Sequence, residues 1–274
     1  MLPDTRELML ESTGDTLTIW FNRPETRNAL SQTMADELAA VLEALPAATD
    51  IRFVILRGKG GAFCSGGDLK MFKSLFQDDA LSEQERRHQI IAFNAGFGRT
   101  LRAVHALPQL FIVLIEGVAM AGGLGLSCIA DVVITTADAR YALSEVSLGI
   151  PPAQIAPLVA RRIGQSEARR LLLTAQRFDG REAHRLGFAH TLVEDGKALD
   201  VAAASLIAQA RRGAPGAIQL TKQILQASEQ LSSDDMVQYG AERFADGLLG
   251  EEGREGMQAF AEKRPPSWSA GGEA

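Results

Sequence analysis

Two glycine-rich segments carry the residues with the clearest potential for chemistry. The first runs from Gly60 to Lys70 (GGAFCSGGDLK) and the second from Glu116 to Gly125 (EGVAMAGGLG). Each follows an apolar run typical of a buried strand, and ligands of parallel sheets gather beyond the carboxyl ends of the strands. Glycines let a substrate approach the backbone, whose N–H groups at a helix start favour negative charge. Two such segments meeting at one carbonyl oxygen would form an oxyanion hole, whereas tight turns are the alternative interpretation.

Other chemistries find little support in the sequence. It contains no G-x-x-x-x-G-K-[ST] phosphate loop, and Gly123–Gly125 does not continue into a dinucleotide-binding pattern. The four histidines lack metal-ligand spacing, so we expect no metal site. Cys64 and Ser65 lie beside the first segment, but no partnered base accompanies them, and packing is the better interpretation. Cys64 and Cys128 are expected to be free thiols.

The bulk composition is that of an ordinary globular protein. The chain has 274 residues, of which 46% are hydrophobic and 23% charged, with a net charge of -6. This charge argues against a nucleic-acid partner but leaves room for an anionic ligand bound by a few basic side chains. The longest apolar stretch is interrupted by Glu116 and Asp131, and the first residues lack a signal-peptide pattern. We therefore expect a cytoplasmic protein with no membrane partner.

Strands and helices alternate in the first half of the chain. The expected strands are Thr16–Asn22, Arg52–Leu56, Leu110–Ile115 and Val132–Thr135. A helix is expected after Ser31, an N-cap residue type, because the apolar residues that follow recur at helical spacing. These are Met34, Leu38, Val41, Leu42 and Leu45. A longer helix is expected over 83–105. Apolar strands joined by helices predict a parallel sheet covered on both faces.

The second half of the chain reads as helical. The expected helices are Ala153–Arg162, Ser166–Ala175, Gly180–Leu186, Lys197–Arg211, Gly216–Ser228, Asp234–Leu249 and Glu251–Glu262. We therefore predict two regions, a sheet-containing core over residues 1–195 and a helical region over residues 196–274.

Several motifs together resemble one family. They are Asn22–Leu30 (NRPETRNAL), Phe63–Lys70 (FCSGGDLK), Glu116–Asp131, Tyr141–Glu145 (YALSE), Leu148–Pro151 (LGIP) and Glu255–Arg264 (EGMQAFAEKR). In this order they resemble the crotonase (enoyl-CoA hydratase/isomerase) superfamily over nearly the whole chain. The resemblance implies an α/β fold, a spiral of ββα units with a C-terminal helical trimerisation region. It also implies an acyl-CoA substrate, no separate cofactor, and a homotrimer or a hexamer built as a dimer of trimers.

The resemblance assigns roles to individual residues. The N–H groups of Gly67 and Gly122 match the two oxyanion donors, and Glu145 matches a catalytic carboxylate. The substrate-binding residues that it implies are Arg27, Gly66, Asp68, Leu69, Lys70, Gly125, Phe260 and Lys263. Among these, the basic residues are candidates for coenzyme A phosphates, and Phe260 for an adenine contact across a subunit interface. Asp68 is expected to cap the following helix rather than to act in catalysis.

Gly125 departs from the family pattern. It stands three residues after Gly122, where the family has a second catalytic carboxylate, so only Glu145 remains for acid–base work. One carboxylate suffices to move a proton between C4 and C2 of a 3-enoyl thioester. Hydration is also possible if the substrate or another polar group positions the water. We expect the missing side chain to leave space beside Cβ for a branched acyl group.

A last segment bears on the substrate. Ser147–Pro157 (SLGIPPAQIAP) lacks the family's usual glycines after its first proline and resembles the branch that acts on isohexenylglutaconyl-CoA in acyclic terpene breakdown. The leading hypothesis is therefore a hydratase for a 3-branched enoyl-CoA. A 3-enoyl to 2-enoyl-CoA isomerase is the alternative, and a weakened, non-catalytic scaffold subunit is a third hypothesis from a different class.

Overall fold

The computed structural model describes residues 2–68, 70, 73 and 81–269. The chain divides into two compact units, Met1–Leu107 with Phe111–Ala203, and Pro108–Leu110 with Ala204–Ala274. The boundary predicted between residues 195 and 196 coincides with the start of helix α7 (Gly196–Ala210), whereas the compact units divide inside that helix.

A six-stranded sheet forms the centre of the first unit, in the order β1-β2-β3-β4-β6-β9. Its strands are β1 (Leu8–Thr13), β2 (Thr16–Phe21), β3 (Phe53–Gly58), β4 (Leu110–Ile115), β6 (Val132–Thr136) and β9 (Thr191–Val193). Strands β2 and β3, β4 and β6, and β6 and β9 pair in parallel, whereas β1 pairs with β2 as an antiparallel edge. The predicted parallel sheet is therefore present, with one antiparallel strand at its edge.

A second, three-stranded sheet has the order β5-β7-β8. It consists of β5 (Val118–Met120), β7 (Arg140–Ala142) and β8 (Phe178–Asp179). Strand β5 runs parallel to β7, and β7 antiparallel to β8. Within this sheet the ring of Tyr141 stacks on Phe178, with ring centroids 5.0 Å apart. The buried hydroxyl of Tyr141 donates to Oγ1 of Thr135 on β6 at 2.6 Å, which ties this sheet to the six-stranded one.

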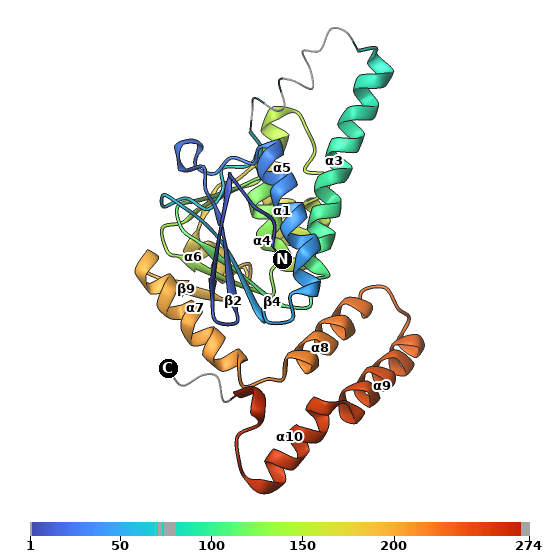
Figure 1. The fold of residues 1–274 in the computed structure, drawn as a ribbon. Coiled ribbons are helices and arrows are strands. Elements are labelled where there is room, and N and C mark those ends of the chain that lie inside the picture. Colours follow the sequence, from blue (N-terminus) through green and yellow to red (C-terminus); the bar gives the residue numbers. More distant parts are fainter. Residues whose placement is uncertain (1, 69, 71–72, 74–80, 270–274) are drawn as a thin grey trace. The chain divides into compact units, whose positions relative to one another are not determined.

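Helices α1 (Gln32–Ala44) and α3 (Glu83–His105) lie side by side in the first unit (Figure 1). Ser31 caps α1 as predicted, since its hydroxyl accepts a hydrogen bond from the N–H of Met34 at 3.0 Å. The apolar face of α1 is buried, as its helical spacing predicts. The remaining helices of this unit are α4 (Gly122–Cys128), α5 (Ala156–Thr174), α6 (Gly180–Arg185) and the first part of α7.

The second unit consists mainly of helices. Beside the end of α7 they are α8 (Pro215–Ala227), α9 (Ser233–Leu249) and α10 (Glu251–Glu262). Many of their large apolar side chains are exposed: Leu225, Val237, Phe244, Leu248, Leu249, Met257 and Phe260. Among the described residues, no helix combines the length and apolar character of a membrane span.

Candidate active site

Three neighbouring segments bring the predicted catalytic residues to one edge. Strands β5 and β7 run in parallel, and Cys64 forms a parallel bridge with Ala119 on the other side of β5. Gly67 follows Cys64 by three residues, Gly122 begins the helix after β5, and Glu145 follows β7 by three residues. Because parallel segments end at the same side, all three residues lie beyond the carboxyl ends of adjacent segments.

The two glycine-rich loops pack directly against each other. A β-carbon built on Gly123 would lie 2.7 Å from the sulfur of Cys64, and one on Gly66 would lie 3.1 Å from Cβ of Ala121. A side chain at Gly123 would therefore push the loops apart. Ala121 adopts φ 47° and ψ -120°, a region rarely occupied by residues with a side chain, and its N–H donates to the carbonyl of Ala142 at 3.0 Å. These contacts fix the turn from which Gly122 emerges.

The N–H groups of Gly67 and Gly122 are available to a ligand. In the parallel bridge between Leu30 and Gly67, Leu30 donates to the carbonyl of Gly66 and accepts from the N–H of Asp68, so the N–H of Gly67 faces away from Leu30. Gly122 is the first residue of α4, where an N–H has no intrahelical acceptor. Neither N–H has an acceptor in the described part of the chain. The two groups can therefore act as paired donors.

Glu145 begins a 3₁₀ helix (η3, Glu145–Leu148) directly after the buried end of β7. Its Oε2 atom is buried and has no hydrogen-bond partner among the described residues. Burial raises the pKa of Glu145 above its usual range because desolvation disfavours the charged form, and a hydrogen bond from its own backbone N–H offsets part of this effect. A partly buried, unpaired carboxylate of this kind suits proton transfer.

The space expected beside Gly125 is absent, which corrects the prediction from sequence. Gly125 is buried in α4, and a β-carbon there would overlap Cγ2 of Ile155. Its φ is not positive, so the glycine is explained by this contact and not by backbone conformation. Ile155, from the segment before α5, thus fills the position toward which a carboxylate at residue 125 would project. Nothing in the sequence pattern had indicated this contact.

Asp68 holds the first loop in place. Its Oδ1 accepts from the N–H of Lys70 and its Oδ2 from the guanidinium of Arg23, both at 3.0 Å. The hydrogen bond from the N–H of Lys70 has the largest effect, and together with the contacts of Arg23 it holds the pKa of Asp68 below its usual range. Buried Asn28 ties the same segments together, since its Nδ2 donates to the carbonyls of Lys59 and Ala62 at 2.9 and 2.6 Å. Both carboxylate oxygens of Asp68 are thus engaged in structural contacts, while most of the helix that Asp68 is expected to cap lies outside the described residues.

Cys64 is not suited to be a nucleophile. It is fully buried against Gly123, and burial raises the pKa of its thiol to about 12. Its packing role is therefore confirmed, and Cys64 and Cys128 are both free thiols as predicted.

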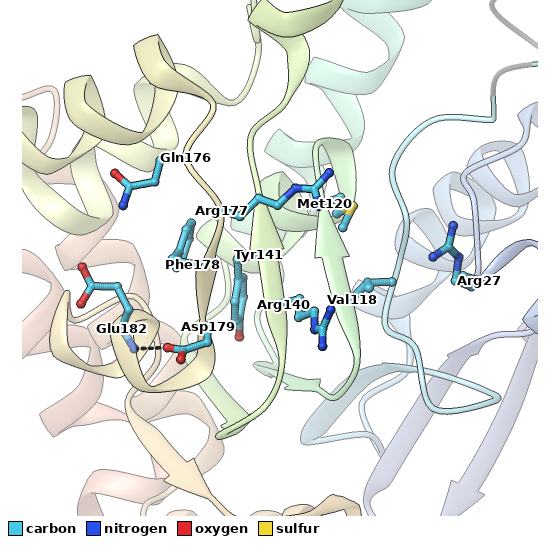
Figure 2. Close-up of a pocket in the computed structure, with 10 residues that line it drawn as sticks. All are labelled: Arg27, Val118, Met120, Arg140, Tyr141, Gln176, Arg177, Phe178, Asp179 and Glu182. Carbon is cyan, nitrogen blue, oxygen red and sulfur yellow. Dashed lines mark hydrogen bonds between the residues drawn. The ribbon is translucent and has the colours of Figure 1, made fainter.

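A groove of about 720 Å³ lies over the three-stranded sheet (Figure 2). Three arginines line it from separate segments: Arg27, Arg140 on β7, and Arg177 just before β8. None of the three guanidinium groups has an ion-pair or hydrogen-bond partner within the described ranges. The apolar part of the groove includes Val118 and Met120 of β5, the strand that leads to Gly122. The groove therefore combines unpaired positive charge with an apolar wall beside the oxyanion loops.

The acidic residues of the groove are engaged elsewhere. Asp179 caps α6 by accepting the N–H of Glu182 at 2.9 Å, the contact drawn in Figure 2. The Glu182 carboxylate pairs with Arg170 and Arg185. Sequence analysis identified Arg27 but missed Arg140 and Arg177, because residues so far apart in sequence meet only through the pairing of β5, β7 and β8.

The other predicted binding residues are placed as follows. Lys70 has an exposed side chain, and Leu69 lies outside the described residues. Phe260 and Lys263 lie in the second unit at the end of α10, where the Phe260 side chain is 84% exposed. Their contact with coenzyme A stays a prediction. In the portion of the chain that the structure describes, no three His, Cys, Asp or Glu side chains cluster as metal ligands do.

Comparisons with known proteins agree on the family. Residues 11–271 match the family described as enoyl-CoA hydratase/isomerase. A putative enoyl-CoA hydratase from Thermus thermophilus is 34% identical over 92% of this chain and 97% of its own length. Among solved structures, Pseudomonas aeruginosa AtuE is 45% identical with a TM-score of 0.91, covering 96% of this chain and 100% of that one. An enoyl-CoA hydratase/isomerase from Marinobacter aquaeolei is 36% identical with a TM-score of 0.90, covering 96% and 99%.

The chain therefore belongs to the enoyl-CoA hydratase/isomerase family and is an enzyme with the crotonase fold. The family and the fold class predicted from its motifs are both confirmed.

Proposed function

We propose that this enzyme adds water to the double bond of a 2-enoyl-CoA thioester. One observation carries the proposal. The unoccupied N–H groups of Gly67 and Gly122 and the unpaired carboxylate of Glu145 all lie at the ends of adjacent parallel segments. Several relatives of 27–34% identity are named enoyl-CoA hydratases, which supports hydration over other reactions of the family.

In this mechanism the thioester oxygen accepts hydrogen bonds from Gly67 and Gly122. The oxygen of a water molecule bonds to Cβ, the electrons of the double bond move toward the thioester oxygen, and one water proton passes to Glu145. The enolate then takes that proton at Cα, which restores the carboxylate and the thioester. Paired donors stabilise the charge that develops on the oxygen. No separate cofactor is proposed, because coenzyme A is part of the substrate and the thioester itself accepts the electron pair.

The groove beside the loops supports recognition of coenzyme A. Its phosphates carry several negative charges, and Arg27, Arg140 and Arg177 present guanidinium groups that have no ion-pair partner in the described residues. Arginine suits phosphate because its planar fork of donors matches the phosphate oxygens. We propose that the groove binds the phosphate end of the substrate, while its thioester lies at the oxyanion donors.

Replacing Arg27, Arg140 or Arg177 with alanine should raise KM by about two- to five-fold each and leave kcat nearly unchanged, because exposed charges contribute modestly. The measurement is steady-state hydration of a CoA thioester and of the matching pantetheine thioester, which lacks the nucleotide. Only the CoA thioester should respond. Arg181→Ala is the control, since Arg181 pairs with Glu194 outside the groove. Equal losses with both thioesters would show that the arginines serve another role.

Because the Ser147–Pro157 segment resembles that branch of the family, we propose that the substrate carries a 3-branched acyl group with a second carboxylate, as in isohexenylglutaconyl-CoA. Within that segment, the side chain of Ile155 fills the space that a side chain at residue 125 would occupy. A place in acyclic terpene breakdown follows from the same resemblance. An isomerase is the second candidate, because Glu145 alone matches a catalytic carboxylate of the family. Both activities require the same oxyanion donors.

The contact between Gly125 and Ile155 makes a specific prediction. Gly125→Ala and Gly125→Glu should both destabilise the fold, since each β-carbon overlaps Ile155. The double variant Gly125→Glu/Ile155→Ala opens space and adds a second carboxylate. It should hydrate an unbranched 2-enoyl-CoA faster than Gly125→Glu does. Thermal unfolding and hydration assays check both points, with Ile155→Ala alone as the control. A double variant no more stable and no more active than Gly125→Glu would contradict this account.

We propose that the enzyme assembles as a homotrimer or as a dimer of trimers. The exposed apolar side chains of the second unit, among them Phe244, Leu249 and Phe260, exceed what a solvated surface normally presents. In such an assembly, Phe260 and Lys263 would contact the coenzyme A bound by a neighbouring copy.

A panel of straight and branched acyl-CoA thioesters tests the function. Hydration removes the absorbance of the conjugated enoyl thioester, whereas isomerisation of a 3-enoyl thioester creates it. We expect loss of absorbance with 2-enoyl substrates, and most rapidly with 3-branched ones. A gain with 3-enoyl substrates alone would establish the isomerase, and no change with any thioester would leave the scaffold hypothesis.

A further inference from the structure

Two neutral amides form a pair between helix α3 and the segment before α5. Nε2 of Gln154 donates to Oδ1 of Asn94 at 2.7 Å. This bond turns Gln154 so that its carbonyl oxygen, Oε1, is the free end of the amide. Oε1 has no other partner in the described portion of the chain, and both side chains are only partly buried. The pair therefore retains hydrogen-bonding capacity for a ligand or water.

The sequence of α3 makes room for this amide. Gly98 lies four residues after Asn94, so both are on one face of the helix. A β-carbon on Gly98 would overlap Oε1 of Gln154, so the glycine is what permits Gln154 to lie against the helix. Asn94 and Gly98 are thus both fitted to the Gln154 side chain.

Residues close to the pair in sequence reach the helix that carries Gly122 and Gly125. Ile155, the next residue after Gln154, occupies the space of the absent side chain at Gly125. Phe97, between Asn94 and Gly98 on α3, would lie 3.3 Å from a β-carbon on Gly122. Phe97 and Ile155, which lie close to the pair in sequence, therefore both pack against the first turn of α4, where the oxyanion donor Gly122 lies.

Two acceptors would orient the attacking water. One is Glu145, which takes the proton, and the second would hold the other O–H so that an oxygen lone pair faces Cβ. A neutral carbonyl oxygen can serve as this second acceptor, because it orients the water without taking a proton and adds no negative charge beside Glu145. Gln154 presents such an oxygen.

We propose that Gln154, fixed by Asn94, positions the attacking water in place of the second carboxylate. Glu145 still accepts the proton and delivers it to Cα, so the balance of the reaction is unchanged. This inference rests on the proposed hydration. The inference assigns proton transfer to Glu145 and water positioning to Gln154. Exchange of a Cα proton needs the oxyanion donors and Glu145 but no positioned water, so the two roles can be measured separately.

The test compares both reactions in Gln154→Met, which keeps the length of the side chain but removes its polar atoms. We expect hydration kcat to fall about 10- to 100-fold, because a misplaced reactant loses about this much. Exchange of the Cα proton of a saturated acyl-CoA in deuterated water should stay within two-fold. Asn94→Ala should lower the hydration kcat less than Gln154→Met does. Asn94→Asp, which keeps the acceptor oxygen, should have a higher hydration kcat than Asn94→Ala, close to that of the wild type.

The outcomes are distinguishable. Unchanged hydration in Gln154→Met would overturn the role of Gln154, and parallel losses of hydration and exchange would reduce the amide pair to a structural contact. A wild-type enzyme that exchanges Cα protons but hydrates no 2-enoyl-CoA would instead overturn the proposed function. Circular dichroism of each variant establishes that the fold survives.

Discussion

Replacing Glu145 with glutamine should lower hydration turnover by about 10²–10⁴. The substitution keeps the shape of the side chain but removes the group that accepts the water proton and returns it to Cα. Substrate affinity, measured by calorimetry with a saturated acyl-CoA, should barely change, because the groove arginines are untouched. The matched control is Glu116→Gln, since Glu116 lies six residues before Gly122, at the far end of the second segment, and its carboxylate pairs with Arg57. Near-full activity in Glu145→Gln would remove this carboxylate from the mechanism.

The pH dependence gives an independent check on Glu145. Its pKa is raised in the folded protein, so the active carboxylate form is lost as the pH falls through a value above the usual glutamate range. For a group with a raised pKa, ionisation opposes folding at neutral pH. Glu145→Gln should therefore unfold at the same temperature as the wild type or a higher one at pH 7. A lower unfolding temperature would indicate a structural role.

Removing an oxyanion donor should have the second large effect. Gly122→Pro deletes the N–H, and turnover should fall by about 10²–10³. Proline is tolerated at the first position of a helix, but the unusual ψ of Ala121 conflicts with a following proline. Thermal unfolding must therefore accompany the kinetics, and Gly67→Pro provides a second variant that lacks a donor.

Gly122→Ala is the matched control for this prediction. It keeps the N–H but adds a β-carbon 3.1 Å from Leu30 and 3.3 Å from Phe97, so it reports crowding alone. Its turnover should fall far less than that of Gly122→Pro. Gly14→Ala, at an exposed glycine with φ 57° in the turn between β1 and β2, reports backbone strain away from the site. If all these variants fold and lose activity equally, the loops are only turns.

Long apolar patterns made much of the fold predictable. The ranges expected for α3, β4 and α10 agree with the structure, because helical periodicity and continuous apolar runs reflect burial directly. The short strands β5 and β7 were not predicted. Each has three residues, too few to show a periodic pattern, and their pairing depends on contacts distant in sequence.

The candidate site was predictable where a motif is local. Gly67, Gly122 and Glu145 each follow a recognisable segment, and the structure brings the ends of those segments together. The surroundings of Gly125 were not predictable, because the sequence shows a missing side chain but not what replaces it. Ile155 fills that position from thirty residues further along the chain, where no spacing rule connects the two.

The most direct test of the account is the fate of deuterium when a 2-enoyl-CoA is incubated with the enzyme in deuterated water. Mass spectrometry and NMR of the product locate the label. Addition of water through Glu145 predicts a 3-hydroxyacyl-CoA with one deuterium at Cα and none at C4. Glu145→Gln and Gly122→Pro should both slow its formation. Deuterium at C4 without a hydroxyl group, or an unlabelled and unchanged thioester, would contradict hydration by this site.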